Sequence, residues 1–291
     1  IVPGSETDIA KLMTAVAAGT GPDVYLIDRF TTAQRAVAGA LTDLTPFIER
    51  AGWKPQDEFL EFAIEESTWA GKIYSLPFDT DTRGLYYRKA DFREAGLDPE
   101  APPTTIDELE QVMAKLTKRI SERRFERIGL IPWLGQGWHY TWGWAFGGEF
   151  YNIETGEVTA DHPNNVRALE WMDELVRFFS GMQAVDLLNS GLPSNHNSFM
   201  SGRIAMAPWG PWELPRFWSY SPDLRFGISF VPHAEGAQPN PTWVGGHKIG
   251  IPRGAKNIEE AWEFLKFITA DPQGTAILAA PIRWFPAYRK S

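Results

Sequence analysis

Apolar residues recur at helical spacing in four stretches of the chain. In the first stretch, residues 9–16 follow an i, i+3, i+4, i+7 pattern, and Gly19 marks the predicted end of that helix. Two segments, Thr105–Glu108 and Asn257–Glu260, have the spacing of a capping box and predict helix starts. The three longer helices predicted from this periodicity cover residues 106–116, 166–179 and 258–268.

Short apolar runs alternate with these helices and predict buried strands. Val24–Ile27 is such a run, suited to a parallel strand covered on both faces, and Asp28 stands at its carboxyl end. Further strands are predicted over 127–132 and 202–207. Because open α/β sheets present ligand-binding groups where a strand ends and a helix follows, the pattern predicts an α/β protein with Asp28 at such a position. Periodicity does not fix the number of domains.

One strand-like run, residues 76–92, carries charges in its middle. Asp79, Asp81 and Arg83 alternate with two threonines, so a strand would place the three charges on one face. Two interpretations are open at this point. The run is either the solvated face of an edge strand, with Arg83 paired to the carboxylates, or a polar wall that holds a ligand rich in hydrogen-bonding groups.

Composition narrows the class of protein. The chain has 291 residues, enough for two compact domains, and its 43% hydrophobic and 22% charged residues are ordinary globular values. A net charge of -9 argues against a nucleic-acid partner, since phosphate contacts need clustered Lys and Arg. The sequence has no cysteine, which excludes disulfides, thiol catalysis and cysteine metal sites, and no apolar run approaches the roughly 20 residues that span a bilayer.

Motifs for common enzyme cofactors are also missing from the sequence. It holds no G-x-x-x-x-G-K-[ST] phosphate loop and no G-x-S-x-G serine motif. Gly135-Gln-Gly137 begins a dinucleotide-like pattern, but Tyr140 occupies the position of the third glycine. The five histidines are scattered and form no H-E-x-x-H pair, so no zinc site is expected. We expect no cofactor, no metal and no catalytic residues.

Tryptophan is the unusual component of the chain. Thirteen are present, nine of them between Trp133 and Trp243, and several lie in the glycine-rich stretch GQGWHYTWGWAFGG. Core packing explains most tryptophans, and Trp171 and Trp262 on predicted helices fit it, but polar loops are poor core material. A sugar suits a mixture of tryptophan, Asp and Arg, because its C–H face stacks on the ring and its hydroxyls take charge-assisted hydrogen bonds. Sugar-binding proteins and glycosidases share this mixture.

Five segments, in order along the chain, resemble the extracellular solute-binding proteins of ABC transporters, in the carbohydrate-uptake group that includes maltose-binding protein. The segments are LMTAVAAGTGPDV from Leu12, GKIYSLPFDTDTRGLYYRK from Gly71, FMSGRIAM from Phe199, WVGGHKIGIP from Trp243 and AWEFLKFI from Ala261. Each segment is loosely specific alone, and together they cover nearly the whole chain.

The resemblance implies an α/β, two-lobed, type II periplasmic-binding-protein-like fold, with a hinge and a sugar-binding cleft between the lobes. The chain is expected to cross between the lobes near Tyr87–Lys89 and near Trp243–Gly246. The implied division is lobe one at residues 1–88 and 245–285, lobe two at 89–244, and the start of a C-terminal segment at 286–291. Because the family normally has more chain before and after this region, N-terminal and C-terminal segments are expected to be missing.

The resemblance also implies a function. The protein would be the extracytoplasmic component of an ABC importer, a monomer held at the membrane by a lipoprotein signal, which binds a sugar or oligosaccharide and delivers it to the permease subunits. Because the family lines its cleft near the first crossing, the polar-wall interpretation is favoured. The expected ligand-binding residues are Asp28, Asp79, Asp81, Arg83, Trp138, Trp142, Trp209, Trp212, Trp243, Gly245, Gly246 and His247.

A glycoside hydrolase is the alternative function. Asp79 and Asp81 on one strand face would lie roughly 6.6 Å apart, near the spacing of a hydrolase carboxylate pair. A hydrolase, however, holds the sugar between its carboxylates and keeps one acid protonated in an apolar setting. Two aspartates beside Arg83 are both expected to stay ionised, which favours a binding protein over an enzyme.

Overall fold

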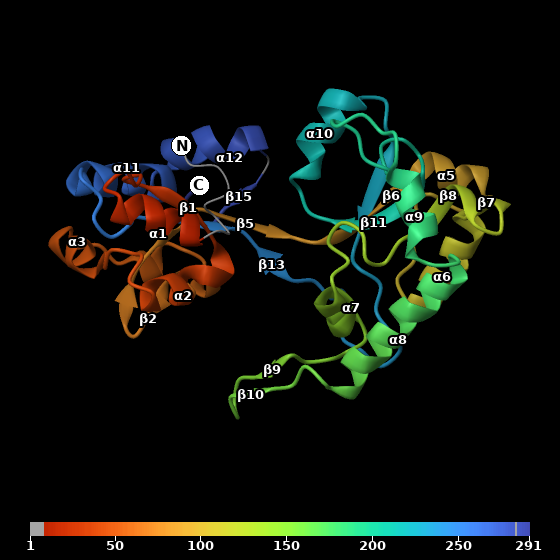
Figure 1. The fold of residues 1–291 in the computed structure, drawn as a ribbon, viewed down its shortest axis with the longest axis horizontal. Helices are drawn as coiled ribbons and strands as arrows, with labels where there is room; N and C mark the ends of the chain where they lie inside the picture. Colours follow the sequence, from red (N-terminus) through yellow and green to blue (C-terminus); the bar gives the residue numbers. More distant parts are fainter. Residues whose placement is uncertain (1–8, 283) are drawn as a thin grey trace. The chain divides into compact units, whose positions relative to one another are not determined.

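The computed structural model describes residues 9–282 and 284–291, which fall into two compact units (Figure 1). The first unit holds the described residues up to Asp81 and again from Val244, and the second unit holds Thr82–Trp243. Residues 1–8, which the sequence analysis assigned to lobe one, lie outside the described residues.

The division differs from the predicted domain boundaries at three places, of which the smallest is Val244, predicted in lobe two and found in the first unit. Residues 82–88, predicted in lobe one, belong to the second unit, because Gly84–Arg88 forms strand β6 inside that unit's sheet. Residues 286–291, predicted as the start of a separate segment, belong to the first unit. Their strand β15 (Phe285–Pro286) pairs with β5 (Asp79–Thr82), which ties them to this unit.

Short strands form three small sheets in the first unit. One has the order β1-β14-β4, a second has the order β13-β5-β15, and β2 pairs with β3. The remaining bounds are β1 (Tyr25–Asp28), β2 (Thr68–Trp69), β3 (Lys72–Ile73), β4 (Leu76–Pro77), β13 (Val244–Gly245) and β14 (His247–Gly250). The expectation of a parallel strand near Val24–Ile27 was wrong, because β1 pairs antiparallel with β14 along its whole length.

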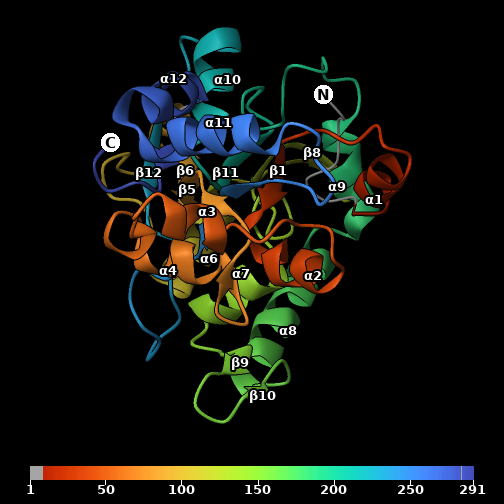
Figure 2. The ribbon, with the colours of Figure 1, turned by 90° about the vertical axis from the view of Figure 1, so that its left-hand side faces the viewer.

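The helices of the first unit surround an aromatic core. They are α1 (Ile9–Ala17), α2 (Thr32–Val37), α3 (Thr45–Arg50), α4 (Glu61–Glu65), α11 (Ile258–Ala270) and α12 (Pro272–Ile282), with 3-10 turns at Arg29–Thr31 and Pro55–Asp57. The helices α11 and α12 lie side by side in both views (Figures 1 and 2). Trp262 on α11 is 1% exposed, and its ring lies 5.6 Å from Phe47 and 6.2 Å from Trp53. The expected core role of Trp262 is therefore confirmed.

A five-stranded sheet with the order β12-β6-β11-β8-β7 organises the second unit. Within it, β11 runs parallel to β8 and antiparallel to β6, so the sheet is mixed. Its strands are β6 (Gly84–Arg88), β7 (Lys118–Ser121), β8 (Arg124–Leu130), β11 (Ile204–Trp209) and β12 (Phe226–Ser229), and a separate hairpin pairs β9 (Tyr151–Asn152) with β10 (Glu157–Val158). The helices are α5 (Lys89–Glu94), α6 (Ile106–Leu116), α7 (His139–Ala145), α8 (Pro163–Phe178), α9 (Met182–Asn189) and α10 (Glu213–Tyr220).

The two predicted capping boxes have different outcomes. Thr105 and Glu108 form the reciprocal pair at the start of α6, as predicted. At α11, Asn257 stands at the N-cap but its side chain caps no helical N–H. Its amide donates instead to Asp23 at 2.9 Å, so this cap position ties α11 to the segment before β1. Within the described part of the chain, no helix has the length and apolarity needed to cross a membrane.

Candidate functional site

The carboxylates of Asp79 and Asp81 on β5 bind the backbone of residues 244–247, where the chain re-enters the first unit. We call residues 244–247 the returning segment. Asp81 Oδ1 accepts the N–H of Gly245 at 2.8 Å, and Asp79 Oδ1 accepts the N–H of His247 at 2.9 Å. Both aspartates are buried, at 4% and 5% exposed, so neither forms a solvated edge. The alternation seen in the sequence therefore places two carboxylates on one face of β5, where they fix residues 245–247.

Gly246 makes this close approach between β5 and the returning segment possible. Its φ of 132° lies in a region that side chains rarely adopt, and a Cβ there would stand 2.4 Å from the carbonyl oxygen of Asp79. Gly245 and Gly246 were both expected among the ligand-binding residues. In the structure, the close approach at Gly246 is to β5.

His247 sits between a carboxylate and an aromatic ring. Its Nδ1 lies 3.2 Å from Asp79 Oδ2, and its imidazole stacks on Trp284 with centroids 4.7 Å apart and planes at 16°. Asp28 is its partner in the β1–β14 register. Burial opposes the charged imidazolium, but the hydrogen bond and charge of Asp79, with the charges of Asp28 and Asp81, outweigh it and raise the pKa of His247.

A second charged network, formed by Arg29, Glu66 and Lys248, binds the same returning segment. Arg29 donates from Nη1 to the carbonyl of Val244 and, at 3.3 Å, to that of Gly245, while its backbone N–H donates to the carbonyl of Gly246 at 3.3 Å. Glu66 accepts from Arg29 Nε at 2.7 Å and lies 3.5 Å from the Nζ of Lys248. Burial lowers the pKa of Lys248 to about 7, with the carboxylate of Glu66 acting in the opposite direction.

The raised pKa of His247 predicts a pH-dependent contribution to stability. Since the folded-state pKa lies above the unfolded value of about 6.5, the stabilisation is complete below that value and is lost as pH rises through the folded-state pKa. We expect the difference in unfolding free energy between wild type and His247→Asn to shrink as pH rises from about 6 through the folded-state pKa. Urea unfolding across this range measures it, and a difference that stays constant would contradict the Asp79–His247 pair.

In the second unit, Arg83 is held by two tryptophans and a glutamine. Its guanidinium carbon lies 3.4 Å from the ring centroid of Trp243 and 4.9 Å from that of Trp212. Nε and Nη2 donate to Gln136 Oε1 at 3.4 and 3.3 Å. Arg83 is only 7% exposed. Its cation–π contacts are therefore largely shielded from water, which strengthens them.

A row of aromatic rings continues from Arg83 along helix α7. Trp243 donates from Nε1 to Thr141 Oγ1 at 2.9 Å, and its ring lies 5.1 Å from that of Tyr140. The Tyr140 ring in turn lies 5.4 Å from Trp144. Tyr140 and Trp144 are four residues apart on α7 and therefore share a face of the helix. We call Arg83, Trp243, Tyr140 and Trp144 the aromatic row.

Glycines bring the loop before α7 against the end of β11. Gly135 has φ +64°, and a Cβ there would stand 2.3 Å from Trp209 Nε1. The next residue, Gln136, donates its backbone N–H to the carbonyl of Pro208 at 2.8 Å, and its side chain reaches Arg83. The glycine-rich stretch of the sequence thus serves close packing of backbone, which places Gln136 and the start of α7 beside Arg83.

Two predicted ligand-binding tryptophans belong to the core instead. Trp142 is 0% exposed, donates from Nε1 to the carbonyl of Pro132 at 2.7 Å and packs on Trp171. Trp209 is 5% exposed, with its ring 4.6 Å from that of Phe199. Both side chains pack against other aromatic side chains of the second unit, as core residues do. Trp171 is itself 6% exposed, as its predicted core role requires.

The remaining predicted residues divide between the two units. The first unit brings together Asp28, Asp79, Asp81, Gly245, Gly246 and His247 around the returning segment. The second unit brings together Arg83, Trp212 and Trp243, and Trp138 stands 54% exposed at the start of α7. Of the three charges in the 76–92 run, Asp79 and Asp81 belong to the first unit and Arg83 to the second.

Sequence reasoning missed six residues of these two clusters: Arg29, Glu66, Gln136, Tyr140, Lys248 and Trp284. A signal existed for Tyr140, which lies at helical spacing from Trp144 in the tryptophan-rich stretch. None existed for Glu66 and Trp284, whose partners are distant in sequence. Over residues 9–282 and 284–291, no group of three or more His, Asp or Glu side chains is placed to hold a metal ion.

The chain belongs to a known family, the bacterial extracellular solute-binding proteins, whose family model matches residues 2–275. The predicted family membership is thereby confirmed, and with it the two-lobed, type II periplasmic-binding-protein-like fold that solved structures of the family share.

Individual relatives are named for sugars. The chain is 31% identical to the protein in the structure "CpMnBP1 with Mannobiose Bound", with a TM-score of 0.86 over 96% of this chain and 70% of the other. It is 26% identical to the maltotriose-binding protein of Pyrococcus abyssi over 94% of this chain, and 24% identical to the arabinooligosaccharide-binding protein of Bacillus subtilis over 94% of this chain. The chain spans only 56% and 63% of the length of these two curated relatives.

Proposed function

We propose that this chain is the extracytoplasmic solute-binding component of an ABC importer, and that it binds a neutral sugar or short oligosaccharide and delivers it to the membrane permease. The observation that carries the proposal is the aromatic row in the second unit, which begins at a buried arginine and ends at the 37% exposed Trp144. Tyr140 is partly exposed between them.

The row has the two properties that sugar recognition needs. Partly exposed aromatic faces accept the C–H face of a pyranose. Arg83 supplies a fixed positive charge for hydroxyl oxygens, because Trp212, Trp243 and Gln136 hold its guanidinium in place before any ligand arrives. Since a preorganised group loses little conformational freedom on binding, most of its interaction energy is retained as affinity.

We propose supporting roles for the first-unit cluster. Asp79 and Asp81 are engaged by backbone N–H groups, and Arg29 holds three carbonyls of the returning segment. These contacts favour a structural task, which is to fix the segment that carries His247. These hydrogen bonds also argue against the hydrolase alternative. A hydrolase needs two carboxylates on either side of a bound sugar, whereas Asp79 and Asp81 both accept backbone N–H groups of the returning segment.

The class of ligand is inferred from the relatives together with the site. Two structures at 31% and 32% identity are titled with bound mannobiose and mannotriose, and curated relatives are named for maltotriose and arabinooligosaccharides. We therefore propose a di- or trisaccharide. An extracytoplasmic location, lipoprotein anchoring and a monomeric state are further parts of the proposal that follow from the family.

A thermal-shift screen tests the function. The panel comprises mannobiose, mannotriose, maltotriose and glycerophosphocholine, and we expect at least one neutral sugar to raise the melting temperature. A ligand that binds only the folded state adds about 2.7 kcal/mol at 100 times its dissociation constant. The sugar should also be returned unchanged after incubation. A response to glycerophosphocholine alone, or release of new reducing ends, would contradict the proposal.

A further inference from the structure

A short basic segment interrupts this acidic chain. Residues 115–127 hold six Lys or Arg and two Glu, a local charge of +4, whereas the whole chain carries -9. The segment covers the end of α6, strand β7 and the start of β8 in the second unit. A concentrated positive charge on a negatively charged protein attracts partners of the opposite sign to this one place.

Five of the six basic residues of this segment fall into two groups, and the sixth, Lys115, is exposed in the last turn of α6. Three are engaged inside the unit: Lys118 pairs with Glu94, Arg127 pairs with Asp91 and Glu94, and Arg119 donates to the carbonyls of Glu122 and Phe178. Arg123 and Arg124, at the tip of the β7–β8 hairpin, are exposed and have no hydrogen-bonding or ionic partner in the part of the chain that the structure describes. Their ten N–H donors are therefore open to a partner.

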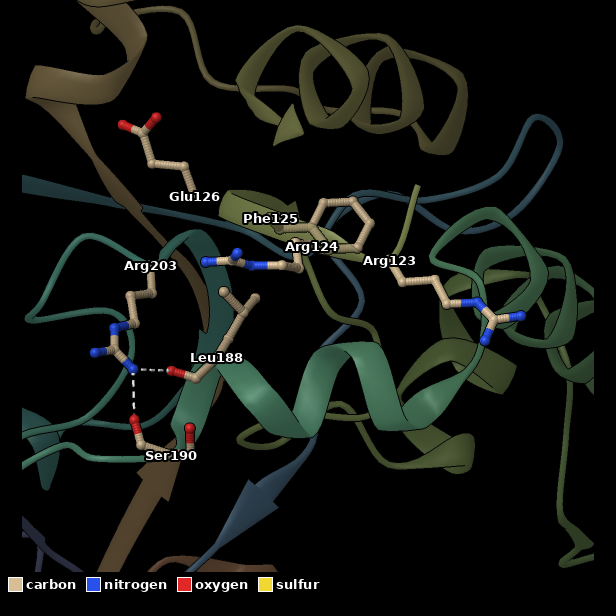
Figure 3. A pocket seen from close by; sticks show the side chains of 7 residues that line it. All are labelled: Arg123, Arg124, Phe125, Glu126, Leu188, Ser190 and Arg203. Atoms are coloured by element: carbon tan, nitrogen blue, oxygen red, sulfur yellow. Dashed lines mark hydrogen bonds between the residues drawn. The ribbon is translucent and has the colours of Figure 1, made fainter. Parts of the chain in front are cut away.

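A pocket lies beside these two arginines, with a cavity of about 410 Å³ (Figure 3). Its lining combines Arg123, Arg124 and Arg203 with one carboxylate, that of Glu126, with Ser190, and with the apolar side chains of Phe125 and Leu188. Arg203 is fixed at the end of α9, because its guanidinium donates to the carbonyl of Leu188 and, at 2.8 Å, to that of Ser190. Figure 3 shows the side chain of Arg124 running towards Arg203 and that of Arg123 running the other way, so the cations spread along the pocket.

The same place is an incomplete sheet edge. Strand β8 pairs with β7 along Arg124–Arg127, but its pairing with β11 begins only at Ile128, opposite Ile204. Before Ile128, the side of β8 that faces away from β7 has no strand beside it among the described residues. The β7–β8 register is also shifted twice here, which is typical of sheet margins. A free stretch of strand can accept an extended peptide by backbone pairing.

We propose that this pocket is a docking site for an acidic, extended peptide segment of a partner protein, which adds to the free margin of β8 and pairs its carboxylates with Arg123, Arg124 and Arg203. Spread cations favour an extended ligand over a single small anion, and the strand margin supplies backbone pairing that a small anion cannot use. The site is remote in sequence from the aromatic row and does not depend on the proposed function.

Fluorescence anisotropy with labelled peptides tests the proposal. The probe is a peptide of alternating Glu and Val, and the expected result is saturable binding that weakens with added salt. Replacing both arginines (Arg123→Glu with Arg124→Glu) should weaken it by about tenfold or more, because each carboxylate then meets a like charge. Arg225→Glu, an exposed arginine elsewhere in the same unit, is the matched control and should change the affinity by less than about twofold.

Two further peptides separate docking from plain electrostatic attraction. A peptide with Lys in place of Glu should not bind. A peptide with the same acidic charge but proline at alternate positions lacks the N–H groups for strand pairing, and should bind at least about fivefold more weakly. Equal loss with Arg225→Glu, equal binding of the proline peptide, or no saturable binding up to about 1 mM would each overturn the proposal. Urea unfolding of every variant checks that the second unit is intact.

Discussion

Trp142→Ala should lower the free energy of unfolding by about 3–5 kcal/mol, the usual cost of deleting a large aromatic side chain from a core. The Trp142 side chain is 0% exposed, its Nε1 donates to the carbonyl of Pro132, and its ring lies 4.8 Å from that of Trp171. The substitution leaves a cavity and also an unpaired carbonyl, which adds to the loss. Urea unfolding followed by far-UV circular dichroism measures the effect.

Trp138→Ala is the matched control for this prediction. Trp138 is four residues away in the same glycine-rich stretch but is 54% exposed. Its removal should change the unfolding free energy by less than about 0.5 kcal/mol. Equal destabilisation by the two substitutions would show that the assignment of core and surface along α7 is wrong.

Glu66→Ala should have an effect of similar size in the first unit. Glu66 is the carboxylate between Arg29 and Lys248, and Lys248 is 1% exposed. Without it, two buried cations lose their shared carboxylate. Removing one partner from a buried ion pair typically costs about 3–5 kcal/mol, and the expected loss lies at the lower end of that range because the Glu66 side chain is 32% exposed. Part of this cost is relieved because Lys248, whose pKa already lies near 7, can lose its proton. The loss should therefore be larger at pH 6 than at pH 9.

Glu65→Ala controls for the loss of a glutamate at the end of α4, since Glu65 is the last residue of that helix and Glu66 is its C-cap. Glu65 is exposed and is the immediate neighbour of Glu66, so its removal should change the unfolding free energy by less than about 0.5 kcal/mol. If Glu66→Ala were equally mild, or if its effect did not depend on pH, the Arg29–Glu66–Lys248 network would not have the role described above.

Local pattern predicted three of the longer helices of this protein well. The segments predicted as α6, α8 and α11 were placed within a few residues, because their apolar spacing records which face is buried. The orientation of β1 was not predictable from its own residues, since its antiparallel partner β14 lies more than 200 residues away. The capping box predicted at Asn257 was also wrong, because the Asn257 side chain hydrogen-bonds to Asp23 and not to a helical N–H.

The candidate site was only partly predictable for a similar reason. Sequence identifies a tryptophan but not whether its ring faces the core, and only the fold separates buried Trp142 from exposed Trp138. The alternation at residues 79–83 correctly placed Asp79 and Asp81 on one face of β5. Arg83 follows the end of β5 at Thr82 and belongs to the other unit. Charge pattern alone cannot show such a change of unit.

Calorimetric titration of the wild-type protein and Arg83→Ala with the sugar found in the thermal-shift screen tests the central claim most directly. The wild type should bind one sugar per chain. Arg83→Ala should bind it about 10- to 100-fold more weakly, because loss of the held guanidinium removes a charged hydrogen-bond donor and loosens Trp212 and Trp243. Arg225→Ala, an exposed arginine of the same unit, should bind like the wild type. Unchanged affinity in Arg83→Ala, or no sugar binding by the wild type, would contradict the account.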